Sequence, residues 1–124
     1  METDLRQDLY QEYCKKMLEI EEKREEYQRR NRNFEQERKE CRERFKEENA
    51  VLERLTEMWG ECEDIGRLRC ELGDSFDEEQ NNINQREEAL AGEYQDICRQ
   101  ERSYEEWYKE ELKNLTEEDM TWQE

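Results

Sequence analysis

The residues best suited to bond or metal chemistry in this chain are five cysteines, at positions 14, 41, 62, 70 and 98. They form no Cys-x-x-Cys pair, and the sequence contains no histidine. A zinc site built from Cys62 and Cys70 would therefore lack two further ligands. We expect no metal site and no cofactor, and we interpret the cysteines as reduced thiols that pack as small hydrophobic side chains.

Carboxylates are abundant, but their pattern does not indicate catalysis. The chain has 38 acidic and 21 basic side chains. Without histidine it lacks the commonest general base. The sequence contains neither a phosphate-binding glycine loop nor a calcium-binding loop of the EF-hand type. We therefore expect no enzymatic activity and no small-molecule substrate.

The composition predicts long helices and excludes several classes of partner. Of the 124 residues, 31% are hydrophobic, 48% are charged and none is proline. This is too little apolar side chain to fill a globular interior, but it suits a solvated helix with one narrow apolar stripe. A net charge of −17 makes nucleic acid and anionic membranes poor partners. The sequence also lacks a signal peptide and a spanning apolar run, so we expect a cytoplasmic protein.

A heptad pattern centred on Leu52, Leu55 and Trp59 organises the rest of the chain. With Tyr13 as position d, the pattern continues in both directions without an insertion, and eleven of the twelve aromatic residues fall at a or d. The exception is Trp107, at g. Such a sustained seven-residue period is typical of a coiled coil. The predicted interaction seam consists of Tyr13, Met17, Ile20, Tyr27, Phe34, Phe45, Leu52, Leu55, Trp59, Phe76, Ile83, Leu90, Tyr94, Ile97, Tyr104, Tyr108 and Leu115.

The polar positions of this pattern favour a parallel dimer. Three a positions in the N-terminal half are Arg24, Asn31 and Arg38, and a buried Asn such as Asn31 specifies a two-stranded register. Glu37 at g would face Arg42 at the following e position of a second copy. We therefore expect an all-α fold, in which a long extended coiled-coil helix of about 110 residues pairs with its own copy in parallel.

The alternative is an antiparallel helical hairpin with a turn near Gly73–Ser75, where Ser75 and Glu78 form a capping-box sequence. A turn would let the two arms choose independent registers, so the unbroken heptad favours the continuous helix. We treat residues 1–124 as one coiled-coil unit. It comprises an N-terminal arm (1–59), a glycine-containing hinge (60–84), a C-terminal arm (85–115) and an acidic tail (116–124) that includes Trp122.

Residues 51–72 widen the apolar stripe, since Val51, Met58, Ile65 and Leu72 add the g position to a and d. This makes the segment Leu52–Trp59 the predicted docking site for a partner. In composition the chain resembles the Glu/Arg-rich coiled coils of cytoskeletal, centrosomal and ciliary structures. That resemblance implies a non-catalytic scaffold, tether or stiffening element of the cytoskeleton or cilium, bound to itself or to other helical proteins. The alternative function is a small hairpin protein, regulatory or chaperone-like, that inserts into a partner complex.

Overall fold

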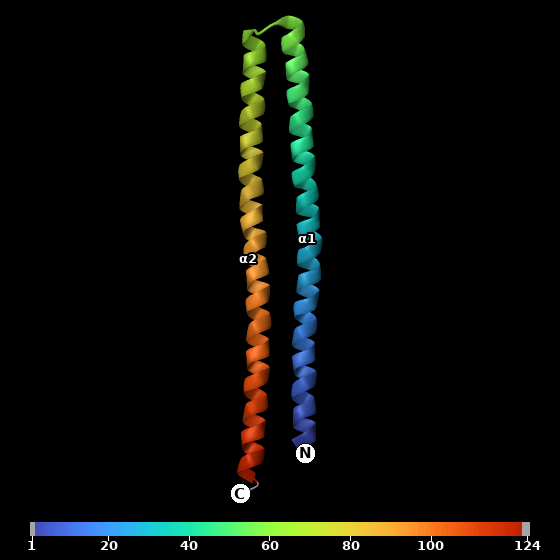
Figure 1. Cartoon of the computed structure of the whole chain (residues 1–124), viewed down its shortest axis with the longest axis vertical. Helices are drawn as coiled ribbons and strands as arrows, with labels where there is room; N and C mark the ends of the chain where they lie inside the picture. The colour runs from blue at the N-terminus through green and yellow to red at the C-terminus, as the bar shows by residue number, and fades with distance from the viewer. Residues whose placement is uncertain (1, 123–124) are drawn as a thin grey trace. The chain divides into compact units, whose positions relative to one another are not determined.

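The computed structural model of the chain is all-α, as predicted, with helix α1 at Glu2–Trp59 and helix α2 at Glu63–Trp122 (Figure 1). The structure describes the backbone of residues 2–122 and the side chains of residues 4–117. Two compact units share these helices. Unit 1 comprises Met1–Gln28 and Ala91–Glu124, and unit 2 comprises Arg29–Leu90. Each unit therefore pairs one segment of α1 with one segment of α2.

In unit 1 the two segments pair through stacked tyrosines. The ring centroids of Tyr13 and Tyr108 lie 4.3 Å apart, and those of Tyr27 and Tyr94 lie 5.5 Å apart. Fourteen residues separate 13 from 27, and fourteen separate 94 from 108, so the segments run antiparallel in one register. Ile20, which is 1% exposed, is buried in this unit.

Unit 2 has its own hydrophobic core. Phe34, Cys41 and Ile83 form a buried cluster, and Leu90 packs against it. Phe45 stacks on Phe76 with ring centroids 4.0 Å apart. The numbering of this last pair continues the pattern of unit 1, because 18 residues separate 27 from 45 and 18 separate 76 from 94. Both units therefore use the same antiparallel register.

The turn between the helices is built around Gly60, whose φ of 75° is the only positive φ in the described backbone. Glycine adopts this left-handed conformation without steric cost, and its N–H donates a 2.8 Å hydrogen bond to the Thr56 carbonyl, as in an αL helix cap. The Arg69 guanidinium donates hydrogen bonds of 3.0 Å to both Glu61 and Thr56. These bonds connect the first turns of α2 to the end of α1.

The expected continuous helix is wrong, since α1 ends at Trp59 and α2 begins at Glu63. The hairpin alternative fits, but its turn lies at residues 60–62 and not at Gly73–Ser75, which is helical. Of the predicted hinge, 60–84, only residues 60–62 are non-helical. With the turn at 60–62 the two helices have nearly equal lengths, 58 and 60 residues. A turn at 73–75 would leave one arm much longer than the other and its apolar face uncovered.

Polar seam positions explain why the antiparallel arrangement suits this sequence. Arg24 forms an ion pair with Glu101 in unit 1, and Arg38 lies 4.0 Å from Glu87 in unit 2. The register also places Asn31 opposite Leu90. In a parallel, in-register dimer each arginine would instead face its own copy, and like charges in one layer repel. Pairing within the chain therefore gives these arginines acidic partners.

Candidate functional site

Most of the predicted seam residues lie between the paired segments of their own unit. The buried ones are Ile20, Phe34, Leu52, Ile83 and Ile97. The half-buried ones are Tyr13, Met17, Tyr27, Phe45, Leu55, Phe76, Leu90, Tyr104, Tyr108 and Leu115, together with the predicted register-specifying Asn31. Trp59 and Tyr94 are exposed, although Tyr94 still contacts Tyr27. The predicted tail residue Trp122 lies outside the described side chains.

The predicted seam leaves out residues at the g position beside it, although the sequence already shows that Ile65 widens the apolar stripe. Leu9 and Ile65 are buried there. Trp107, the one aromatic residue off the seam, lies beneath Lys16, whose Nζ is 4.9 Å from its ring centroid. In an antiparallel pair the g positions of the two helices face each other. Knowing the direction of pairing would therefore have identified these contacts.

The same g positions carry the polar contacts between the helices. Arg86 donates a 2.5 Å hydrogen bond to Glu37, and Lys23 donates a 2.6 Å bond to Gln100. Glu37 thus pairs across the hairpin with Arg86, in place of the g-to-e pairing with Arg42 that a parallel dimer would use. These exposed pairs select a register more than they contribute stability.

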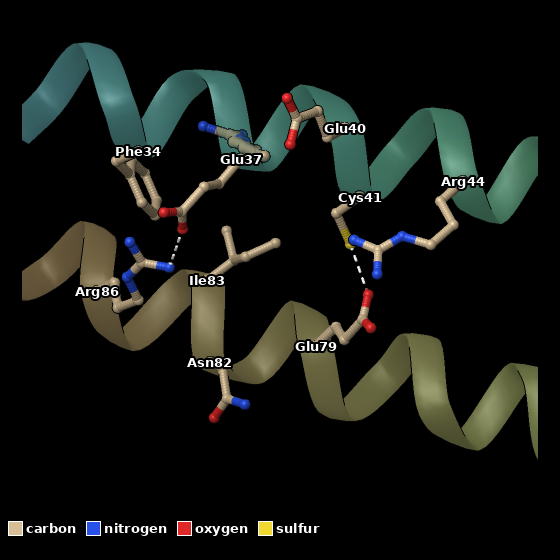
Figure 2. Close-up of a pocket in the computed structure, with 10 residues that line it drawn as sticks. Phe34, Glu37, Glu40, Cys41, Arg44, Glu79, Asn82, Ile83 and Arg86 are labelled. Carbon is tan, nitrogen blue, oxygen red and sulfur yellow. Dashed lines mark hydrogen bonds and ion pairs between the residues drawn. The ribbon is translucent and has the colours of Figure 1, made fainter.

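Unit 2 contains a hollow of about 350 Å³ that is lined by residues of both helices, Cys41 among them (Figure 2). It is lined by apolar side chains and by charged side chains of both signs, which come from both helices. The lining residues are Phe34, Glu37, Arg38, Glu40, Cys41, Arg44, Glu79, Asn82, Ile83 and Arg86. Three of them are glutamates and three are arginines, so the charges cancel. The hollow therefore has no net charge to select an anion or a cation.

Cys41 is the residue in this hollow with nucleophilic potential, and its surroundings suppress that potential. The thiol is 5% exposed and its Sγ donates a 2.7 Å hydrogen bond to Oε2 of Glu79. This bond, followed by burial and the negative charge of Glu79, raises the pKa of the Cys41 thiol. Because the thiolate is the reactive form, a raised pKa makes Cys41 a poor nucleophile. The arrangement supports packing of the two helices, with no sign of an activated cysteine.

The end of unit 2 nearest the turn has a different character. Val51 and Met58 on α1, and Ile65 and Leu72 on α2, all occupy g positions and form the surface we call the turn flank. Val51 and Met58 are 52% and 77% exposed, whereas Ile65 is buried and Leu72 half-buried. The neighbouring Trp59 is 75% exposed. This segment thus presents large apolar side chains to solvent beside the buried seam.

Charged residues around the turn flank give it an acidic border. From 51 to 72 the chain has six acidic residues and three arginines, a net charge of −3. Exposed apolar residues in unit 1, such as Leu5 and Leu18, fall instead at different heptad positions and share no single flank. The turn flank is therefore the strongest candidate interaction site among the described residues.

Comparison with family models, with curated proteins and with solved structures finds no match for this chain. None of the described helices is both long enough and apolar enough to cross a membrane. Inference about function therefore depends on the contacts and exposed surfaces of the chain itself.

Proposed function

We propose that this protein is a non-catalytic helical hairpin that binds another helical protein through its turn flank. The observation that carries the proposal is the exposure of Val51, Met58 and Trp59 at one end of unit 2. Large exposed apolar side chains gathered at one end of a unit are unfavourable in water, and such surfaces commonly mark binding sites. Tryptophan and methionine are also enriched at protein interfaces.

Pairing within the chain decides which surface is left for a partner. The seam residues that would bind a second helix already contact the other helix of their own unit. While the two helices of the hairpin stay paired, a partner must therefore bind outside the seam, and the turn flank is the apolar surface beside it. This favours a hairpin binding protein over a scaffold built on an open seam. A role as scaffold or tether in a cytoskeletal or ciliary assembly would use the same flank.

The spacing of the turn flank suits an amphipathic helix as the bound element. Val51 and Met58 lie two helical turns apart on α1, as do Ile65 and Leu72 on α2, a repeat of about 10.5 Å. Such a row matches a partner helix with apolar anchors at positions i and i+7. The acidic border favours lysine or arginine beside those anchors, since charge complementarity steers association.

Site-specific photo-crosslinking tests this function. A photoreactive amino acid at position 58 should capture a partner protein in cells, whereas the same group at Leu18 should not. Leu18 is the matched control because it is also exposed, at 57%, but lies in unit 1.

Affinity for the captured protein would then be measured with two charge variants. Met58→Asp should weaken binding of the captured protein at least tenfold, because a charge replaces an apolar side chain that the partner would cover. Leu18→Asp should leave binding unchanged. Equal capture at the two positions, or equal loss of affinity in the two variants, would contradict the assignment of the turn flank.

A further inference from the structure

Two features of the turn are not required by a hairpin. The heptad pattern runs through residues 60–62 without an insertion, so that Leu55, Trp59, Cys62 and Gly66 keep the order d, a, d, a. A turn imposes no such continuity, since each arm has its own register. In addition, Trp59 occupies a seam position but is 75% exposed. Both features have an explanation if residues 60–62 can become helical. The heptad then continues from one arm into the other, and Trp59 packs against a second chain.

We infer that two copies of this protein exchange arms to form an antiparallel dimer. In the dimer, residues 60–62 straighten and join α1 and α2 of each copy into one helix. The α1 segment of one copy then pairs with the α2 segment of the other. Trp59 of each copy lies opposite Cys62 of the second copy, where the seam covers it.

The register allows the same residue pairs to form within one chain and between two copies. The antiparallel pairing is symmetric about residues 60 and 61, so position 45 of one copy lies opposite position 76 of the other. The contact between Phe45 and Phe76 therefore forms again between copies, as does every other seam pair. A protein of different sequence would not supply this complete set of partners. A second copy of the chain is thus the occupant that fits Trp59.

Few contacts belong to the hairpin alone. The bond from the Gly60 N–H to the Thr56 carbonyl spans four residues, so a continuous helix retains it. The Arg69–Thr56 hydrogen bond can form between copies, because it spans the two helices. The Arg69–Glu61 ion pair, within the turn itself, is lost. Since glycine adopts helical and left-handed φ values with similar ease, Gly60 permits both forms.

Exchange goes beyond the proposed docking function and does not depend on it, because its test measures molecular mass alone. Wild-type protein, Gly60→Ala and a chain with three glycines inserted between Glu61 and Cys62 would be compared by sedimentation equilibrium in 150 mM salt. Gly92→Ala is the matched control, since Gly92 also has open space around a Cβ but lies within α2. Helix content from circular dichroism establishes that each variant is folded.

We expect the wild-type mass to rise from one chain towards two with increasing concentration. Gly60→Ala should lower the dimer dissociation constant by roughly 10²- to 10³-fold, because alanine disfavours positive φ and favours helix in both copies. The glycine insertion should abolish the dimer, since it shifts the heptad of the second arm while a hairpin tolerates a longer loop. Gly92→Ala should behave as wild type.

Three results would overturn the exchange. The first is a Gly60→Ala protein that remains a single chain at every concentration. The second is dimerisation of the insertion variant as strong as that of Gly60→Ala. The third comes from a chain whose only tryptophan is Trp59, made by Trp107→Phe and Trp122→Phe. Acrylamide quenching of Trp59 should fall severalfold on dimerisation, and unchanged quenching in the dimer would exclude burial of Trp59 between copies.

Discussion

Replacing Phe34 with alanine should destabilise unit 2 more than any comparable change at a half-exposed aromatic residue. Phe34 is 2% exposed and packs with Cys41 and Ile83, and the Arg86 guanidinium lies 5.2 Å from its ring centroid. Removal of a buried phenylalanine typically costs about 3–5 kcal/mol. A core made by only two helices can relax towards the cavity, so we expect a cost near the lower end, about 3 kcal/mol.

Tyr94→Ala is the comparison, because Tyr94 is 49% exposed and its ring contact with Tyr27 is tilted, at 5.5 Å. Half the burial and one aromatic pair correspond to about 1–2 kcal/mol. Urea unfolding followed by circular dichroism gives both free energies of unfolding, provided that the m-values agree with wild type. A loss below about 1 kcal/mol for Phe34→Ala, or equal losses in the two variants, would refute the assignment of the core.

Two further predictions concern charge and protonation in unit 2. Glu37→Arg and Arg86→Glu should each lower the free energy of unfolding by up to about 1 kcal/mol. The double variant should recover most of that loss, because it restores the ion pair with its charges exchanged. Additive losses in the double variant would contradict the pairing. Because the folded pKa of the Cys41 thiol is raised, the stabilisation from its bond to Glu79 is complete below the unfolded pKa, about 8.5. Stability should then fall as pH rises through the folded pKa. Cys41→Ala should flatten this decrease in stability at alkaline pH. Iodoacetamide should label Cys41 at least about tenfold more slowly than the exposed Cys62. Equal labelling rates would contradict the buried, hydrogen-bonded thiol.

The sequence was sufficient to predict the all-helical fold and which side of each helix is apolar. Long-range periodicity determines which side of a helix is apolar, whatever the direction of its partner. Ile20, Phe34 and Ile83, which the heptad places at d, are accordingly buried in the structure. The turn was harder to place, because Gly60, Gly66 and Gly73 look alike in sequence.

Direction of pairing required a comparison between distant residues. The g-to-e charge pattern suits a parallel dimer, but the ion pairs of Arg24 with Glu101 and of Arg38 with Glu87 form only when the helices are antiparallel. Each pair is more than 45 residues apart in sequence, so local patterns do not identify it. The exposure of Trp59 was missed for the same reason, since it follows from the position of the turn.

Paired cysteines at positions 45 and 76 test the antiparallel hairpin most directly. The rings of Phe45 and Phe76 stack with centroids 4.0 Å apart, so these two positions face each other across the helix pair and are the natural place for introduced cysteines. The five native cysteines would first be replaced by alanine, and oxidation would be carried out at low micromolar concentration. Cysteines at 45 and 83 serve as the control, since the added seven residues shift one of them by about 10.5 Å along the helix.

Mass spectrometry of the oxidised protein then gives the answer. The antiparallel hairpin predicts a 45–76 disulfide within a single chain, and little or none between 45 and 83. A disulfide joining position 45 of one chain to position 45 of another, with no 45–76 bond, would show a parallel dimer and contradict the account.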